Sequence, residues 1–337
     1  MRFLPTDEQS DFARTLRSLL GAAEVPATVR AWADGEHGPG RALRSRLAGT
    51  GLFALAAPEP YEGLGLLPLE LSLGFVELGR AAVPGPLVES AAASVLLAEL
   101  GDEGLAKRFV PGLVTGESSA TLTLPGGGPY ALDADAATHC LTVSPAGELR
   151  LAGGPGEPLA STDPARRLFR PAPDGELLAA GPAVAAAAET ALRWARLLTA
   201  AQCLGVGEAL LARTVEYAKQ RTQFGVPIGS FQAVKHRLAD TLLALEFARP
   251  LVWAAALSPA APDVAAAKLS AGEACRRAAM TALQLHGAIG YTEELDLSLW
   301  LRKARPLRDA WGTPSACRAE VLRPVASGGS AGGWGRL

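Results

Sequence analysis

A short turn between two long runs of helical period constrains the fold of this 337-residue chain more than any other feature. Apolar residues recur at three- and four-residue steps before and after the turn, which predicts two amphipathic helices. These positions are Leu204, Ala209, Leu210, Ala212, Val215 and Ala218 before it, and Val234, Leu238, Leu242 and Leu245 after it. Residues 225–229 break both helices, because proline lacks a donor and glycine favours non-helical dihedrals.

The turn carries side chains that suit a nucleotide. Arg221, Phe224 and Gln232 are expected to project from this fixed corner. The planar fork of an arginine matches a pyrophosphate, and an aromatic ring suits a nucleobase. The corner is therefore a candidate nucleotide-binding element.

Two segments carry a family resemblance. Residues 221–240 match R-x-x-F-G-x-x-I-x-x-F-Q-x-x-x-x-x-L-A-D, and residues 284–292 are similar to Q-x-x-G-G-x-G. Together they resemble the acyl-CoA dehydrogenase family, which implies FAD as cofactor and an acyl-CoA substrate. In that family each flavin spans a subunit interface. The resemblance implies that the ADP half of an FAD contacts Arg221, Phe224, Phe231, Gln232, Gln284, Gly287 and Ala288, while its ring lies mainly in a neighbouring subunit.

The predicted fold is mainly α with a small β domain. Alternating residues over 121–124, 138–143 and 148–152 predict short strands, and most of residues 183–325 has helical period. The expected helices cover 6–20, 42–52, 69–80, 88–100, 103–115, 183–220, 231–257, 262–286 and 295–305, with a loop from 21 to 41. The expected domains are an N-terminal helical domain (1–116), a shortened β domain (117–182), a C-terminal four-helix bundle (183–325) and a disordered glycine-rich tail (326–337).

Composition narrows the class of partner. The chain has 32 Lys and Arg against 34 Asp and Glu, so no net field would recruit nucleic acid or an anionic membrane. No eighteen apolar residues run together without a charge or proline, and the N-terminus lacks an apolar signal segment. The four cysteines lie far apart, which predicts reduced core thiols, no metal site and a cytoplasmic location. Three tryptophans on helix faces are expected in the core: Trp194, Trp253 and Trp300.

The loop after the first predicted strand departs from the family. Members usually carry T-E-P-x-x-G-S-D there, a loop that touches flavin and acyl-CoA. This chain has Thr123 and Pro125 but no glutamate, serine or aspartate, and residues 126–128 are glycines. The usual tryptophan-containing strand beside the flavin ring is also missing. The resemblance therefore implies that the flavin-ring side of this chain's own pocket is altered.

The catalytic carboxylate of the family has no counterpart at its usual positions. An acyl-CoA dehydrogenase removes an α-proton with a glutamate, placed either in a Y-E-G-T loop or on the first bundle helix. Trp311 stands at the first position, and residues 192–196 at the second contain no acid. Glu189, Asp309 and Glu320 are the acids that could substitute. Asp309 is more simply an ion pair or a cap, and Glu320 lies in what reads as an exposed helical turn.

Three functional hypotheses follow. The leading one is a flavin-binding subunit of a heteromeric enzyme whose partner carries the glutamate, similar to heterotetrameric dehydrogenases that shorten steroid and other bulky side-chain CoA thioesters. The alternatives are a self-associating dehydrogenase with a relocated base and a catalytically silent scaffold of the same fold. Two groups receive structural interpretations: His236 and His286 as caps or satisfied polar contacts, and Arg302, Arg305 and Arg308 as a solvated helix face that could otherwise approach a CoA phosphate.

Overall fold

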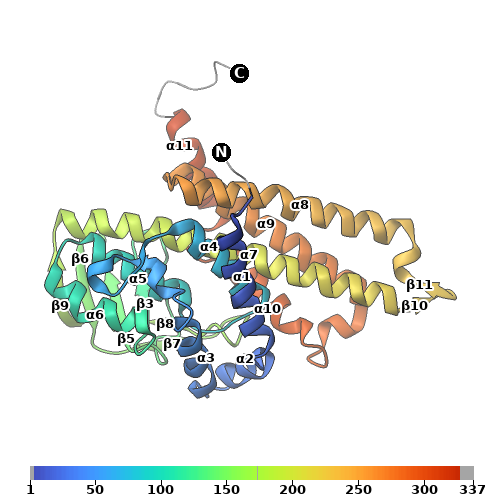
Figure 1. The fold of residues 1–337 in the computed structure, drawn as a ribbon, viewed down its shortest axis with the longest axis horizontal. Helices are drawn as coiled ribbons and strands as arrows, with labels where there is room; N and C mark the ends of the chain where they lie inside the picture. The colour runs from blue at the N-terminus through green and yellow to red at the C-terminus, as the bar shows by residue number, and fades with distance from the viewer. Residues whose placement is uncertain (1–3, 173, 327–337) are drawn as a thin grey trace.

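The N-terminal third of the protein is a set of helices. The computed structural model describes residues 4–172 and 174–326, and Figure 1 shows these helices near the middle and left of the molecule. They are α1 (Asp7–Gly21), α2 (Val25–Ala33), α3 (Gly38–Ala48), α4 (Pro68–Arg80), α5 (Leu87–Glu99) and α6 (Glu103–Thr115). Thr6 is the N-cap of α1. Its hydroxyl accepts a hydrogen bond from the Gln9 backbone N–H, and the Gln9 side chain accepts one from the Thr6 backbone N–H. This capping box confirms the predicted start of the first helix.

The prediction for residues 21–52 is wrong. Two helices, α2 and α3, occupy the expected loop, and the helix expected at 42–52 begins four residues earlier and ends at Ala48. Pro26 and Pro39 lie in the first turn of α2 and α3, where a missing backbone N–H costs no hydrogen bond. They therefore mark helix starts, whereas the prediction treated this proline-rich stretch as a loop. Val25, Val29 and Trp32 are buried at helical spacing.

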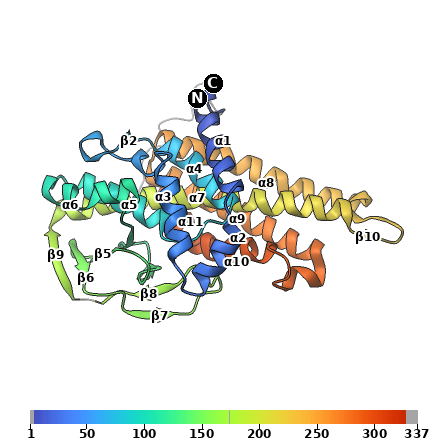
Figure 2. The same ribbon diagram turned by 60° about the horizontal axis from the view of Figure 1, so that its bottom comes forward.

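The strands of the two larger sheets lie beneath α5 and α7, as Figure 2 shows. A four-stranded sheet has the order β3-β5-β6-β9 and a three-stranded sheet the order β4-β8-β7. β3 and β5 are parallel, and the other pairs in these two sheets are antiparallel. The strands are β3 (Ala120–Thr123), β4 (Ala131–Leu132), β5 (His139–Val143), β6 (Glu148–Ala152), β7 (Glu157–Leu159), β8 (Leu168–Arg170) and β9 (Gly175–Ala180). A further short ribbon pairs β1 (Ala56–Ala57) with β2 (Gly65–Leu66).

The C-terminal half is built on α7, the longest helix (Figure 1). α7 is apolar and long enough to cross a membrane, but 83% of its most apolar window is buried inside the protein, as in the core helix of a folded domain. The elements here are α7 (Pro182–Gln220), β10 (Thr222–Gln223), β11 (Val226–Pro227), α8 (Gln232–Leu257), α9 (Ala261–His286), the 3-10 helix η4 (Gly287–Tyr291), α10 (Leu297–Asp309) and α11 (Pro314–Ala326).

The predicted fold class is confirmed: the chain is mainly helical with a small β part. α11 is an additional C-terminal helix that the four-helix prediction omitted, and it places Glu320 in a regular helix with its side chain 13% exposed, where an exposed turn was expected. Trp194, Trp253 and Trp300 are buried as predicted. The domain boundaries remain a prediction, and the predicted tail lies outside the described residues beyond Ala326.

Candidate functional site

The predicted nucleotide corner is a tight hairpin at the end of the α7 and α8 pair. Thr222 pairs with Pro227 and Gln223 with Val226, while the Ile228 N–H donates to the Arg221 carbonyl at 2.8 Å. Figure 1 shows this hairpin projecting at the far right of the molecule. The corner is therefore the tip of the α7 and α8 pair, and it lies away from the two larger sheets.

Phe224 occupies an unfavourable backbone conformation at this tip. Its φ is 54°, in the left-handed region that bulky residues avoid, and the following Gly225 has φ 80°. The Phe224 side chain is 92% exposed. Its ring meets that of Phe231 edge to face, with centroids 6.2 Å apart. The aromatic pair is thus displayed to solvent.

All seven predicted cofactor-binding residues lie on the surface. They are Arg221, Phe224, Phe231, Gln232, Gln284, Gly287 and Ala288, and each is exposed. Within residues 4–172 and 174–326, the Arg221 guanidinium has no hydrogen bond or ion pair to a protein group. A Cβ added at Gly225 or Gly287 would meet no atom within 4 Å, so the backbone is open to close approach. Free donors, an aromatic pair and open backbone fit the ADP half of an FAD.

Tyr217 and His286 join the two segments of this surface, residues 221–232 and residues 284–288. Their rings stack with centroids 4.1 Å apart, and the Tyr217 hydroxyl donates to the His286 carbonyl at 3.5 Å. His286 Nδ1 lies 2.8 Å from the Ala282 carbonyl, and burial lowers the pKa of the imidazole. Since Tyr217 precedes Arg221 by one helical turn and His286 directly precedes Gly287, the contact holds both elements on one side of the bundle. His286 is the satisfied polar contact that was expected.

Trp311 is buried in the loop between α10 and α11. Its side chain is 7% exposed and its φ is 58°, again in the left-handed region. The indole Nε1 donates to the Glu89 carboxylate of α5 at 3.1 Å. Arg196 Nε of α7 donates to the Trp311 carbonyl at 2.8 Å. Trp311, which the resemblance aligns with the family's base position, is thus hydrogen-bonded to both α5 and α7.

The glycine loop after β3 closes over the Trp311 indole. A Cβ added at Gly127 would lie 2.6 Å from the Trp311 ring, so only glycine fits this approach. The loop that in the family touches flavin and acyl-CoA here packs on a tryptophan. We call Glu89, Gly127, Arg196 and Trp311 the closed cluster.

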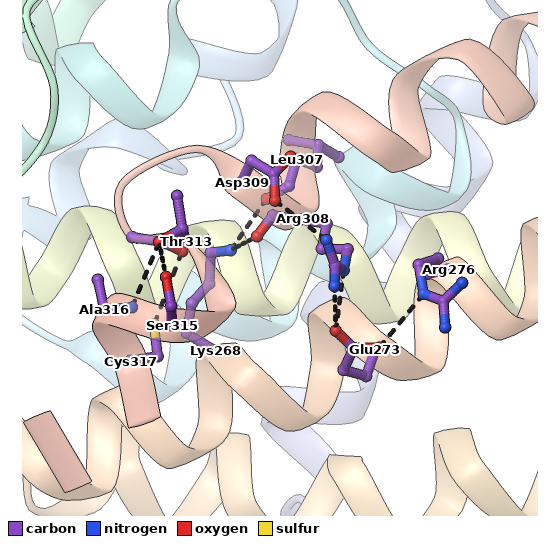
Figure 3. Close-up of polar contacts among 11 residues, drawn as sticks. Lys268, Glu273, Arg276, Leu307, Arg308, Asp309, Thr313, Ser315, Ala316 and Cys317 are labelled. Atoms are coloured by element: carbon purple, nitrogen blue, oxygen red, sulfur yellow. Dashed lines mark hydrogen bonds and ion pairs between the residues drawn. The ribbon is translucent and has the colours of Figure 1, made fainter. Parts of the chain in front are cut away.

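Lys268 of α9 anchors the loop that carries Trp311. Its Nζ donates to the carbonyls of Leu307 and Arg308 at 2.9 and 2.8 Å, and its side chain is 1% exposed (Figure 3). These carbonyls end α10 and would otherwise lack partners. Arg308 also donates to Glu273 of α9 at 2.6 and 2.8 Å. Both cations therefore fix the end of α10 against α9.

One buried acid, Glu89, belongs to the closed cluster, and other buried acids interact with it electrostatically or through a shared cation. Burial raises the pKa of Glu89, and the positive charge of Arg166 opposes that shift. Asp133 is also fully buried, and desolvation raises its pKa to about 7, with Arg166 again opposing. Asp163 pairs with Lys303 of α10 at 3.4 Å, both nearly buried. Glu89 is thus electrostatically linked to a set of buried charged groups.

None of the three acids considered as substitute bases belongs to the closed cluster. Glu189 is exposed on α7, Asp309 pairs with Arg308 at 3.3 Å as expected, and Glu320 pairs with Arg323 at 2.7 Å. Arg302 pairs with Glu293, so this arginine is part of an ion pair on the α10 surface.

Glu89 is the buried acid that sequence reasoning missed. It lies in α5, whose residues from Leu87 to Leu97 are all buried. A lone acid inside such an apolar run is a signal for a paired or functional carboxylate, because acids are seldom buried alone. Lys268 carries the same signal within the alanine-rich part of α9.

The described ranges hold no group of three or more His, Cys, Asp or Glu side chains that could bind a metal ion. All four cysteines are free and buried, as predicted.

Family models identify the class of protein that this fold and surface define. Residues 6–117 match the acyl-CoA dehydrogenase N-terminal domain, and residues 185–324 match the acyl-CoA dehydrogenase C-terminal domain. The chain belongs to the acyl-CoA dehydrogenase family, whose members are FAD-dependent oxidoreductases.

Particular relatives are similar over nearly the whole chain. The acyl-CoA dehydrogenase IpdE2 of Mycobacterium tuberculosis is 35% identical, over 96% of this chain and 98% of its own length. Among solved structures, the ChsE4-ChsE5 complex from Mycobacterium tuberculosis matches with a TM-score of 0.85 and 28% identity, covering 97% of this chain and 99% of the matched chain. A Tcur3481-Tcur3483 steroid acyl-CoA dehydrogenase variant matches with a TM-score of 0.85 and 27% identity, over 96% of this chain and 99% of the matched chain.

Proposed function

We propose that this chain is a subunit of a heteromeric acyl-CoA dehydrogenase, and that it holds the ADP half of an FAD whose ring and catalytic glutamate belong to a homologous partner. The observation that carries the proposal is that Trp311, which the resemblance aligns with the family's base position, is buried and hydrogen-bonded to Glu89. A carboxylate there would have to face a substrate, whereas the indole faces a packed protein interior. Two relatives of similar fold are named as two-chain assemblies, which supports a partner for this chain as well.

The roles of this chain's residues are binding and orientation. The Arg221 fork would pair with the pyrophosphate, and the Phe224 and Phe231 rings would contact the nucleoside part. Gln232 and Gln284 would add amide hydrogen bonds, and Gly287 and Ala288 would allow close backbone approach. The FAD supplies hydride acceptance at its ring, and the partner's carboxylate would remove the α-proton of the acyl-CoA. A cytoplasmic location is consistent with four free thiols.

Dye-coupled oxidation of acyl-CoA thioesters tests this division of labour. The chain purified alone should show little or no turnover, because a general base contributes roughly 10²–10⁴-fold to such a step. The co-expressed pair should be a flavoprotein with one active site per two unlike chains, and changing the partner's glutamate to glutamine should abolish its activity.

Robust turnover by the lone chain would overturn the proposal. In that case Glu189→Gln, Asp309→Asn, Glu320→Gln and Glu89→Gln would locate the base. Absence of FAD from both the lone chain and the pair would instead favour the silent scaffold.

A further inference from the structure

A cavity lies among α1, α2, α4, α7 and α10. Its lining includes none of the seven predicted cofactor-binding residues and none of the closed cluster. Its volume is about 320 Å³, at the lower end of the range of roughly 300–1,000 Å³ typical of small-molecule pockets. Leu20, Val25 and Pro26 form an apolar side. The family match assigns no role to this cavity.

The opposite side of the cavity carries an excess of positive charge. Arg17, Arg80 and Arg213 line it together with one carboxylate, Glu77. Arg17 donates to Glu77 at 2.7 and 3.0 Å, and Arg80 donates to the same carboxylate at 3.1 Å and also pairs with Glu208. In the part of the chain that the structure describes, the Arg213 guanidinium has no hydrogen bond or ion pair to protein. Arg213 is therefore the cation left for a ligand.

Trp300 holds the Arg213 guanidinium in place. The Arg213 Cζ lies 3.7 Å from the centre of the Trp300 ring, within the range of a cation–π contact. Trp300 is 1% exposed, and its Nε1 donates to the Arg80 carbonyl at 2.9 Å, which fixes the ring plane. Desolvation lowers the pKa of Arg213, as expected for a guanidinium partly withdrawn from water, while the negative charge of Asp296 opposes that shift without a direct ion pair. The fork is thus pre-positioned at the cavity wall.

We propose that this cavity binds a small organic carboxylate, with the carboxylate on Arg213 and a short apolar body against Leu20, Val25 and Pro26. A guanidinium fork matches the two oxygens of a carboxylate, whereas a neutral ligand would leave the Arg213 donors unused. The apolar wall favours an alkyl or aryl body over a bare inorganic anion. This inference is independent of the flavin proposal, because it concerns another surface of the chain.

Calorimetric titration of the full chain with hexanoate tests the head group. Arg213→Gln should weaken hexanoate binding about tenfold or more, as expected for loss of a hydrogen bond to a charged group. The matched control Arg277→Gln, an exposed arginine of α9 outside the cavity, should bind hexanoate as the wild type does. Hexanol, which has the same body without the charge, should bind more weakly than hexanoate. Equal affinity of Arg213→Gln and the wild type, or of hexanol and hexanoate, would overturn the proposal.

A crystal soaked with 4-bromobenzoate tests the location. Anomalous scattering should place bromine inside the cavity, near Val25 and Pro26, in the wild type and not in Arg213→Gln. Bromine found only elsewhere would refute the site. Binding at crystal concentration only, with no saturable hexanoate binding down to a Kd of about 1 mM in solution, would refute it too. Because the Arg213 guanidinium makes no hydrogen bond or ion pair to the described chain, Arg213→Gln should have a melting temperature close to that of the wild type. Arg213→Lys provides a second variant that keeps the charge without the fork.

Discussion

Phe224 and Trp311 occupy similar backbone positions in opposite surroundings. Both are aromatic residues in the left-handed region, with φ of 54° and 58°, and each precedes a glycine. For residues other than glycine this conformation costs roughly 1–2 kcal/mol. Trp311 is 7% exposed and hydrogen-bonded to Glu89, so packing offsets the cost. Phe224 is 92% exposed, and its one aromatic neighbour in the described chain is Phe231.

The difference separates a buried corner at Trp311 from an exposed corner at Phe224. The Trp311 corner is closed, and both the indole N–H and the carbonyl of Trp311 are hydrogen-bonded within the chain. The Phe224 corner keeps a strained aromatic residue and free donors on the surface, and such strain persists where function requires it. This contrast is the one expected from the proposed function, in which the open corner binds a cofactor shared with a neighbouring subunit and the closed corner supplies no base.

The largest expected effect is at the closed corner. Trp311→Ala removes a buried indole and leaves Glu89 without its donor, so the free energy of unfolding should fall by about 3–5 kcal/mol. Urea unfolding measures this loss of unfolding free energy. Trp311→Phe keeps most of the volume and loses the N–H, so it should cost only about 1–3 kcal/mol. A loss below about 1 kcal/mol for Trp311→Ala would mean that the corner is loosely packed and could open.

Asp133, a buried acid that interacts electrostatically with Glu89, should make stability sensitive to pH. Folding raises the pKa of Asp133 from 3.8 to about 7, so the native state binds this proton more tightly than the unfolded chain. The resulting stability is complete below about pH 4 and is lost as pH rises through 7, by at most roughly 4 kcal/mol. Asp133→Asn keeps an acceptor for the Arg167 N–H and should flatten this decline in urea unfolding between pH 4.5 and 8.

The exposed Asp34→Asn is the control, because a carboxylate in solvent loses little hydration on folding. If wild type and Asp133→Asn lost stability in parallel between pH 4.5 and 8, Asp133 would not be the group that titrates.

Sequence patterns predicted the fold best where the helices are long, although the expected apolar face of α8 includes Leu242, which is exposed. The helices at 183–220, 231–257 and 262–286 were placed within one residue at each end, because a long repeated pattern leaves few alternatives. Residues 21–52 failed, since prolines at the first turn of a helix look like breakers in a sequence. The replacement of the family's glutamate by Trp311 stays a prediction from the resemblance, whereas the structure shows that Trp311 is buried.

The partners of Trp311 could not be predicted in the same way. Glu89 is separated from Trp311 by 222 residues, and Gly127 belongs to a third element, so their contact depends on how helices and strands pack. Lys268 is a similar case, because its partners are backbone carbonyls that carry no side-chain signal. Local patterns specify which elements form, whereas the closed cluster arises from packing between distant elements.

A smaller effect is expected at the open corner. Arg221→Ala should weaken FAD binding by the assembled enzyme about ten- to hundredfold, the equivalent of roughly 1.5–3 kcal/mol for a hydrogen bond to a charged group. Arg221→Lys keeps the charge without the fork and should give an intermediate loss. Flavin retention after dilution, followed by absorbance, measures both. Unchanged retention in Arg221→Ala would remove Arg221 from the cofactor site, and the same measurement on Arg277→Ala checks for a nonspecific charge effect.

The smallest effect should have opposite signs in the lone chain and in the assembled enzyme. Phe224→Gly relieves a left-handed backbone at a side chain that is 92% exposed, so the lone chain should gain about 1 kcal/mol in unfolding free energy. Phe224→Ala keeps a Cβ and should leave the lone chain within about 0.5 kcal/mol of the wild type. Both variants lose the ring and should release FAD faster from the assembled enzyme. A glycine variant that is stabilised alone and retains FAD fully would show that the strain at Phe224 serves no cofactor, and the contrast with Trp311 would then be one of packing alone.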